Sequence, residues 1–186
     1  RVPCNNLVGR LNDGWSIAKA LLGFERFFVG SPKTCRNALS KAMALAVARG
    51  TARDPVTVDR YTRFELDVEA LESLYKAFAD LIRRGEVPGA DISLLKIYAS
   101  ETFQRLTEFA LDLGGETGVQ VDGAETEIAP GIEPRIEPGI ESGTAVSPET
   151  IDALYAWYNA RPTTIYGGSN EIQRNIIAKL VLRLPT

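Results

Sequence analysis

A seam of apolar and aromatic residues between positions 61 and 82 restricts the fold more than any other feature. Its members are Tyr61, Phe64, Val68, Leu71, Tyr75, Phe78 and Ile82. Their spacing alternates between three and four, which keeps all of them on one face of an α-helix. Asp54-Pro55 is typical of a helix start, and Arg83-Arg84-Gly85 of a helix end. We therefore expect one long helix whose seam is buried against other helices, with about 1.5–3 kcal/mol from each buried Leu or Phe.

Further segments show helical periodicity between similar start and stop signals. They cover residues 14–29, 32–48, 92–113 and 148–160, and the segment that follows Ser169. Asp13, Ser31 and Asp91 are the expected caps of the first three. Residues 1–12 are predicted to be a strand end and a loop. The predicted fold is therefore all-α, an up-and-down helical bundle with a short strand end at the N-terminus.

Residues 116–147 have a different composition from the rest of the chain. Ile132-Glu133-Pro134, Ile136-Glu137-Pro138 and Ile140-Glu141-Ser142 repeat with a period of four. The segment is acidic and rich in proline, and it offers little contiguous apolar surface. We expect a long extended or mobile loop without helix at about 119–147.

Composition excludes several classes of function. The net charge is -3, with both signs spread along the chain, so the basic stripe of a nucleic-acid-binding protein is absent. No apolar run approaches the ~20 residues of a membrane span. The sequence contains no histidine, which excludes Ser-His-Asp and Cys-His catalysis and most zinc chemistry, and we expect no metal site. Two cysteines without metal-ligand spacing suit a reducing cytoplasm.

Residues 163–179 are predicted to be a loop that turns into a helix. Gly167 and Gly168 give the backbone conformational freedom and leave space beside it. Ser169 is a good N-cap, and the helix places an apolar stripe of Ile172, Ile176, Leu180 and Leu184 on one side. A helix start after glycines presents free N–H groups to an anion or a cofactor, although most such starts are ordinary turns.

This stretch closely resembles the C-terminal signature of the acyl-CoA dehydrogenase family. The start of the chain resembles the family's passage from its middle β-domain into its C-terminal helical domain. The matching segments are Val2-Pro3, Asn6-Leu7-Val8-Gly9, Asp13-Gly14-Trp15 and Leu22-Gly23-Phe24-Glu25-Arg26. The resemblance spans nearly the whole chain, more weakly between 32 and 90 and hardly at all between 119 and 147. It implies that residues 1–12 end the β-domain and its linker, and that 13–186 form the helical domain of a longer protein.

The resemblance also implies a reaction. In this family a carboxylate takes the α proton of an acyl-CoA, and FAD takes the β hydrogen as hydride. Many members carry the carboxylate in a Tyr-Glu-Gly loop before the last helix, where this chain has Tyr166-Gly167-Gly168. Isovaleryl- and long-chain-type members have it on the first helix before an arginine, which implies Glu25 as the base. By itself, Glu25-Arg26 is more simply read as a solvated or ion-paired patch on a helix.

Other site residues follow from the same resemblance. Cofactor contacts are implied for Leu111, Gly114, Gly115, Ser169, Asn170 and Glu171, and acyl-CoA contacts for Arg26, Tyr166, Gly167, Gly168 and Lys179. In the family, the glycine turn at 111–118 approaches the FAD of a neighbouring subunit. Many members also carry Arg-x-x-Phe-Gly, whose arginine reaches the FAD diphosphate. This chain departs from that motif, and Arg49 or Arg53 is the candidate replacement.

Three functional hypotheses remain open at this point. The first is the C-terminal part of an FAD-dependent acyl-CoA dehydrogenase, inactive by itself. The second is a scaffolding subunit of a dehydrogenase heteromer, and the third a flavoenzyme of the same fold such as a nitroalkane oxidase. The implied partners are an acyl-CoA, an electron-transfer flavoprotein as electron acceptor, and a homo-oligomer (dimer or tetramer) or a related subunit.

Overall fold

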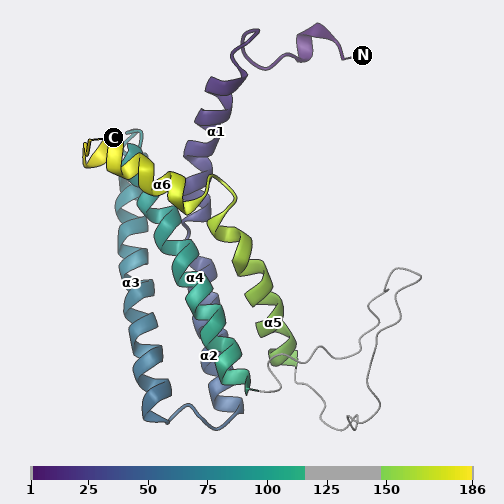
Figure 1. The fold of residues 1–186 in the computed structure, drawn as a ribbon, viewed down its shortest axis with the longest axis vertical. Helices are drawn as coiled ribbons and strands as arrows, with labels where there is room; N and C mark the ends of the chain where they lie inside the picture. The colour runs from purple at the N-terminus through teal and green to yellow at the C-terminus, as the bar shows by residue number, and fades with distance from the viewer. Residues whose placement is uncertain (1, 116–147, 186) are drawn as a thin grey trace.

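The computed structural model describes residues 2–115 and 148–185, and every regular element in these ranges is helical (Figure 1). The helices are α1 (Gly14–Val29), α2 (Lys33–Ala48), α3 (Pro55–Arg83), α4 (Ser93–Gly114), α5 (Pro148–Ala160) and α6 (Asn170–Ile176). Short 3₁₀ turns cover Cys4–Asn6, Ala90–Ile92 and Arg161–Thr164, and a π-helical turn at Ile177–Val181 extends α6. The predicted all-α fold is confirmed for the described residues.

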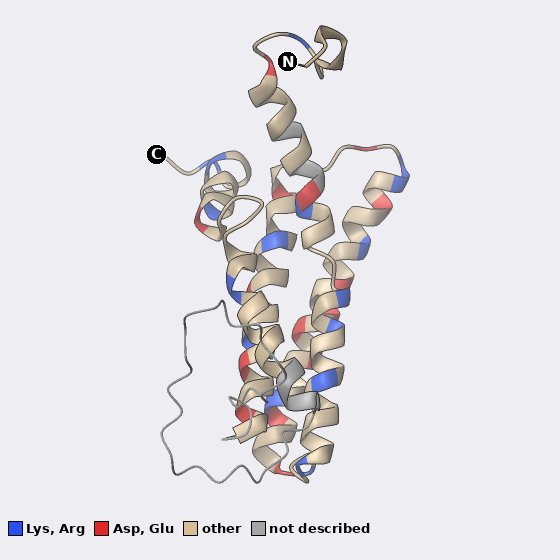
Figure 2. Ribbon diagram, turned by 90° about the vertical axis from the view of Figure 1, so that its right-hand side faces the viewer, with Lys and Arg blue, Asp and Glu red and all other residues tan. Residues whose placement is uncertain are grey.

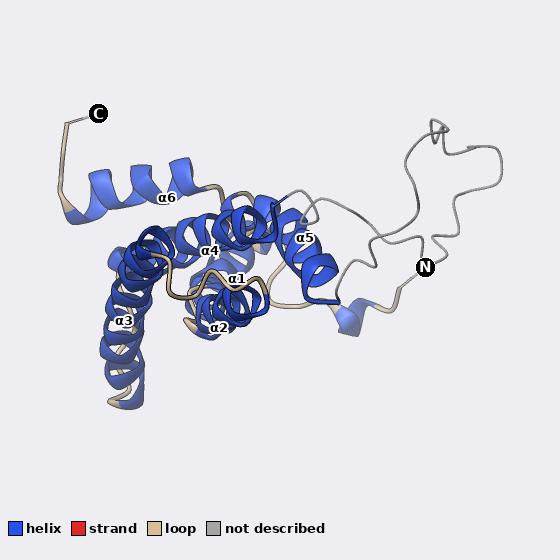
Figure 3. Ribbon diagram, turned by 90° about the horizontal axis from the view of Figure 1, so that it is seen from below, coloured by secondary structure: helices blue, strands red, loops and turns tan. Residues whose placement is uncertain are grey.

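Helix α4 is the centre of the bundle. It packs against α1, α2, α3, α5 and α6. Helices α2, α3, α4 and α5 run alongside one another, α6 crosses one end of them, and α1 extends beyond that end (Figures 1 and 3). Helix α1 and the chain before α6 therefore lie at the same end of α4.

Helix α3 forms as its sequence pattern predicts. The Asp54 carboxylate accepts a hydrogen bond of 3.0 Å from the backbone N–H of Thr57, and Pro55 occupies the first helical position. Val68 and Leu71 are completely buried, and Phe78 is 6% exposed. Phe64 packs on Phe109 of α4 with ring centroids 5.3 Å apart. The seam is therefore the face that joins α3 to the core, as expected.

Three local predictions were wrong. The N-cap of α2 is Pro32 and not Ser31, whose Oγ accepts from the Lys33 N–H at 3.4 Å. Cys4–Asn6 forms a 3₁₀ turn, and the described residues contain no strand. A strand needs a partner for its backbone N–H and C=O groups, and residues 2–115 and 148–185 offer none, since all their regular elements are helical. Asp91 does not cap α4 with its side chain, because it lies inside the 3₁₀ turn that precedes the helix. The prediction of an extended loop at 119–147 falls outside the described residues.

Charged residues of both signs are interspersed along the helices (Figure 2). Arg36 of α2 forms ion pairs with Glu65 and Glu72 of α3, and Arg105 of α4 pairs with Asp67 of α3 at 3.0 Å. These pairs link neighbouring helices at the edge of the apolar core. Within the described ranges, no helix has both the length and the apolar character required to cross a membrane.

Cys35 is expected to resist alkylation in the folded protein. Its side chain is 1% exposed, and its Sγ atom donates to the Ala99 carbonyl at 3.4 Å. Burial raises the pKa of this thiol to about 12, so only roughly 10⁻⁴ of it is thiolate at pH 8. Iodoacetamide at pH 8, followed by peptide mass spectrometry, should leave Cys35 unmodified until denaturant is added. Rapid labelling in the native state would contradict this burial.

Candidate functional site

The carboxylate of Glu25 and the backbone of Gly167 meet at one end of the bundle. A Cβ atom at position 167 would lie 3.5 Å from Glu25 Oε1 and 3.6 Å from its Cδ. Glu25 is half-buried on α1, and Gly167 belongs to the loop before α6. The two positions at which the resemblance predicts a base therefore border the same space, one with a carboxylate and the other with no side chain.

Gln173 fixes the conformation of this loop. Its side chain is completely buried, and its Nε2 atom donates to the carbonyls of Gly167 and Gly168 at 3.1 Å each. Both glycines have positive φ, +68° and +87°. A Cβ at position 168 would lie only 2.8 Å from Gln173 Nε2. Glycine is therefore required at 168 by both backbone conformation and space.

Ser169 and Asn170 connect the loop to α6. Ser169 Oγ accepts from the backbone N–H of Ile172 at 3.5 Å, which is the predicted N-cap. Asn170 is 2% exposed, and its Nδ2 donates at 3.0 Å to Ser100 Oγ and to Glu101 Oε1 of α4. Its Oδ1 accepts a 2.6 Å hydrogen bond from Lys96 Nζ. The start of α6 is therefore attached to α4 through polar side chains.

Sequence reasoning missed Lys96. The periodicity of α4 gives no signal for it, because lysine on a helix is normally read as an exposed residue.

The predicted apolar stripe of α6 also has a different environment from the one we expected. Ile172, Leu180 and Leu184 are 52%, 67% and 53% exposed in this chain, whereas the polar residues Asn170 and Gln173 are buried.

The charged groups of the site act on one another. Burial lowers the pKa of Arg26, and the negative charge of Glu25 opposes that change. Burial, and secondly the same Glu25 charge, raises the pKa of Tyr166. A hydrogen bond from Ser169 lowers the pKa of Glu171, an exposed residue. The negative charge of Glu25 thus acts on both Arg26 and Tyr166.

A cavity of about 380 Å³ lies beside Tyr166. Phe28 and Val29 line it from α1, Cys35 from α2, and Phe103 from α4. Phe28 and Val29 follow Glu25 by three and four residues, so they lie on the same face of α1 as the carboxylate. The walls of the cavity therefore include the helical turn of α1 that follows Glu25. They combine apolar side chains with the polar residues Ser31, Thr34, Ser100, Asn159 and Thr163.

The predicted glycine turn lies at the other end of α4. That helix has 22 residues and is roughly 33 Å long at about 1.5 Å per residue. The helix ends with Leu111, Gly114 and Gly115, and Gly115 has a φ of +57°. Arg49 donates to the Gly114 carbonyl and would lie 3.6 Å from a Cβ at Gly115. The structure therefore separates these three residues from Glu25, and Lys179 lies on the exposed turn after α6.

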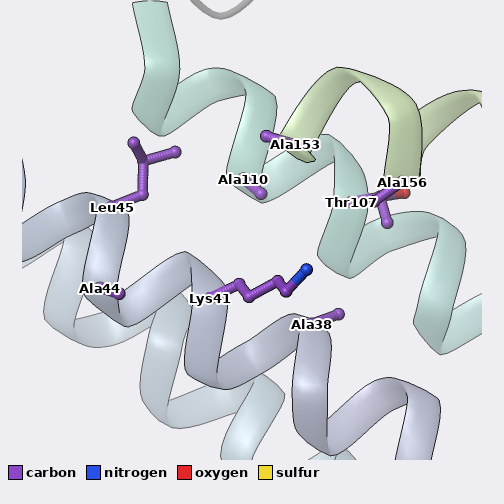
Figure 4. Close-up of a pocket in the computed structure, with 8 residues that line it drawn as sticks. All are labelled: Ala38, Lys41, Ala44, Leu45, Thr107, Ala110, Ala153 and Ala156. Atoms are coloured by element: carbon purple, nitrogen blue, oxygen red, sulfur yellow. The ribbon is translucent and has the colours of Figure 1, made fainter. Parts of the chain in front are cut away.

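A smaller hollow of about 70 Å³ lies between α2, α4 and α5 (Figure 4). Five alanines line it together with Leu45, Thr107 and Lys41. It contains no carboxylate and none of the predicted site residues, so it is a gap between closely packed helices. Among the described residues, no group of three or more Cys, Asp or Glu side chains is arranged to hold a metal ion.

Comparison with known proteins gives consistent matches. Residues 12–182 match the family model "Acyl-CoA dehydrogenase, C-terminal domain". The chain is 32% identical to acyl-CoA dehydrogenase IpdE1 of Mycolicibacterium smegmatis over 187 residues, covering 100% of this chain and 40% of that protein. It is also 32% identical to IpdE1 of Mycobacterium tuberculosis, covering 100% of this chain and 42% of the relative.

A solved structure described as "Tcur3481-Tcur3483 steroid ACAD" superposes with a TM-score of 0.74 at 25% identity. That match covers 99% of this chain and 43% of the solved chain. The chain thus spans about two fifths of the length of these three relatives.

Proposed function

This chain belongs to the acyl-CoA dehydrogenase family, and we propose that it contributes the base to an FAD-dependent site that dehydrogenates an acyl-CoA thioester. One observation carries this proposal: the carboxylate of Glu25 borders the space where a side chain at position 167 would begin. Residues 13–186 would form the helical domain of the intact enzyme, with 1–12 leading out of its β-domain. By itself the chain would lack much of the cofactor site and would not turn over.

In this proposal Glu25 accepts the α proton of the substrate. Gly167 has no side chain, so the thioester end of the acyl-CoA fits between the loop and α1. Gln173 holds that loop by its two backbone carbonyls, which keeps the space open. Bound FAD supplies the acceptor for the β hydrogen, which leaves as hydride. A half-buried carboxylate suits this step, because a fully solvated one is a weak base toward carbon.

The residues at this end of the bundle fit a flavin and an acyl-CoA. Gln173 Oε1 and Arg26 Nε are buried and have no hydrogen-bond partner within the described part of the chain. Buried polar atoms of this kind are normally satisfied, so they indicate a ligand or another domain. The two glycines leave backbone accessible beside them. We assign Ser169, Asn170 and Glu171 to the cofactor side, and Arg26, Tyr166, Gly167, Gly168 and, more remotely, Lys179 to the substrate side.

The cavity beside Tyr166 suits the hydrocarbon part of the substrate. Phe28, Val29 and Phe103 give it an apolar part, and Phe28 and Val29 lie one helical turn after Glu25 on α1. An acyl chain whose α carbon lies at Glu25 would extend along that part. One solved relative is described as a steroid enzyme, so a ring-bearing acyl group belongs among the substrates to be tried.

The distance between the two groups of cofactor residues supports an oligomer. The end of α4 away from Glu25 carries Leu111, Gly114 and Gly115. We therefore propose that these residues contact the FAD of a neighbouring subunit. Arg49 donates to the Gly114 carbonyl and lies beside Gly115, so it would supply the positive charge of the altered Arg-x-x-Phe-Gly motif. The neighbour is a second copy or a related subunit, and an electron-transfer flavoprotein is the proposed acceptor of the electrons.

Flavin reduction in the full-length protein tests this function. The purified holoenzyme is mixed anaerobically with a panel of linear, branched and ring-bearing acyl-CoAs, and separately with a nitroalkane. We expect an acyl-CoA to bleach the flavin absorbance and the nitroalkane to leave it unchanged. Bleaching by the nitroalkane alone would replace our proposal with an oxidase of the same fold. Bound FAD that no substrate reduces would indicate a scaffolding subunit.

A further inference from the structure

Gln104 of α4 attaches the segment of chain that leads into the loop before α6. Its Nε2 atom donates to the Ala160 and Arg161 carbonyls at 3.1 Å each, and to Thr164 Oγ1 at 3.2 Å. These partners lie at the end of α5 and in the 3₁₀ turn Arg161–Thr164. Two of them are carbonyls, which only accept hydrogen bonds, so the nitrogen of the amide must face them. Gln104 therefore holds this turn through a single amide group.

Arg161 attaches the same turn from the opposite direction. Its Nη2 atom donates to the backbone carbonyl of Gln104 at 3.2 Å, and its Nη1 atom pairs with Glu108 of α4 at 2.8 Å. The guanidinium also lies over the ring of Trp157, 4.7 Å from the ring centroid. The side chains of Gln104 and Arg161 thus each donate to the backbone carbonyl of the other residue, which fixes the turn to the middle of α4.

The turn leads directly into the loop that borders Glu25. The Pro162 carbonyl accepts from the backbone N–H groups of Ile165 and Tyr166, at 2.9 and 3.1 Å. Gly167 follows, and a Cβ there would lie 3.5 Å from Glu25 Oε1. The position of Gly167 relative to the carboxylate therefore depends on the turn that precedes it.

Helix α4 supports both sides of the gap between Glu25 and Gly167. On one side, α1 carries Glu25 and packs on α4 so closely that a Cβ at Gly30 would lie 2.5 Å from Leu95 Cβ. On the other side, Gln104 holds the turn before the loop. The contacts of these two segments with one helix therefore set the width of the gap.

We propose that Gln104 is a positioning residue: by holding the turn before Tyr166, it sets the distance between the loop and Glu25, and so the alignment of a bound thioester with its base. This inference rests on the proposed function, since it concerns how the substrate is placed beside the base. Gln104 itself does not touch the substrate. Gln173 attaches the loop from its other end, so removal of Gln104 would release only the side that precedes Tyr166.

Three substitutions vary the number of hydrogen bonds to the turn. Gln104→Met keeps the approximate length of the side chain and removes all three of them, Thr164→Val removes the one to the hydroxyl, and Thr164→Ser keeps it. In the full-length holoenzyme, the limiting rate of flavin reduction by an acyl-CoA should fall about tenfold in Gln104→Met, because a small displacement of reacting groups slows their reaction. The fall should be smaller in Thr164→Val and absent in Thr164→Ser. Thr62→Val, at an exposed position of α3, is the matched control and should keep the wild-type rate.

The outcome that would leave Gln104 a purely structural role is distinct. A lower melting temperature or weaker FAD binding in Gln104→Met, with flavin reduction at the wild-type rate in the molecules that retain FAD, would overturn the proposal. If Gln104→Met does not fold, the two substitutions at Thr164 decide, and equal rates for Thr164→Val and Thr164→Ser would overturn it.

Amide exchange gives a readout that does not depend on turnover. Peptides that cover residues 162–168 should exchange faster in Gln104→Met than in the wild type, while peptides of α2 should be unchanged. Unchanged exchange across 162–168 would show that Gln104 does not hold the loop, and would overturn the proposal.

The parallel variant Glu25→Gln distinguishes this inference from the proposed function. If Glu25→Gln reduces its flavin at the wild-type rate, the assignment of the base fails whatever the Gln104 variants do. If Glu25→Gln is slow while Gln104→Met and Thr164→Val reduce their flavin at the wild-type rate, only the role of Gln104 is wrong.

Discussion

Flavin reduction by an acyl-CoA should slow by about 10²–10⁴-fold when Glu25 is replaced by glutamine, because the proton loses its acceptor. Glutamine keeps the shape and the hydrogen-bonding capacity of the side chain, so binding of FAD and of the acyl-CoA should remain close to wild type. Stopped-flow absorbance under single-turnover conditions separates the reduction step from substrate binding. The measurement requires the full-length protein with its cofactor bound.

A matched control is Glu69→Gln on the exposed surface of α3, which should reduce its flavin at the wild-type rate. A wild-type rate in Glu25→Gln as well would show that the base is elsewhere, in a part of the protein outside this chain or on a different subunit. Weak FAD binding in Glu25→Gln would instead assign the residue to cofactor retention.

Adding Gly167→Glu to the Glu25→Gln variant should restore part of the rate. A Cβ at position 167 would lie within 4 Å of the residue-25 carboxyl group, so a carboxylate from the loop reaches the same space. Restoration should be incomplete, because the backbone at 167 has a φ of +68°, which strains any residue with a Cβ. A double variant no faster than Glu25→Gln would show that the loop does not reach the α proton.

The second large effect concerns stability and the placement of α1. Gly30 ends α1 where it touches α4, and a Cβ there would lie 2.5 Å from Leu95 Cβ and 2.9 Å from the Arg26 carbonyl oxygen. Gly30→Ala should therefore force α1 and α4 apart and lower the free energy of unfolding by about 1–3 kcal/mol. For a chain of this size, that corresponds to a fall in melting temperature of roughly 2–4 °C per kcal/mol.

Gly14→Ala provides the control for this substitution. It lies at the first position of the same helix, and nothing approaches within 4 Å of the added Cβ. Its melting temperature, measured by calorimetry beside that of Gly30→Ala, should stay at or slightly above the wild-type value. Equal melting temperatures for all three proteins would show that α1 is not tightly packed on α4.

The sequence by itself determined the helices and the face that α3 buries. Asp54-Pro55 begins α3 and Arg83-Arg84-Gly85 ends it as predicted, and Ser169 caps α6, because caps and helical periodicity depend on neighbours only a few residues away. The combination of Glu25 with Gly167 was also visible in the sequence. Interpreting this combination required the resemblance to a family. A glutamate on a helix or a glycine in a loop does not by itself indicate a catalytic base.

The tertiary structure decided which side chains are buried at the site. Lys96, Asn170 and Gln173 are inside, whereas Ile172 and Leu180 are exposed, which reverses the expectation from polarity. The prediction of a strand end within residues 1–12 was also wrong. A β-strand forms only when a second strand, distant in sequence, pairs with its backbone. The reason is the same in each case. A polar group becomes stable in the interior only when partners from distant parts of the chain satisfy it, and no local pattern encodes where those partners lie.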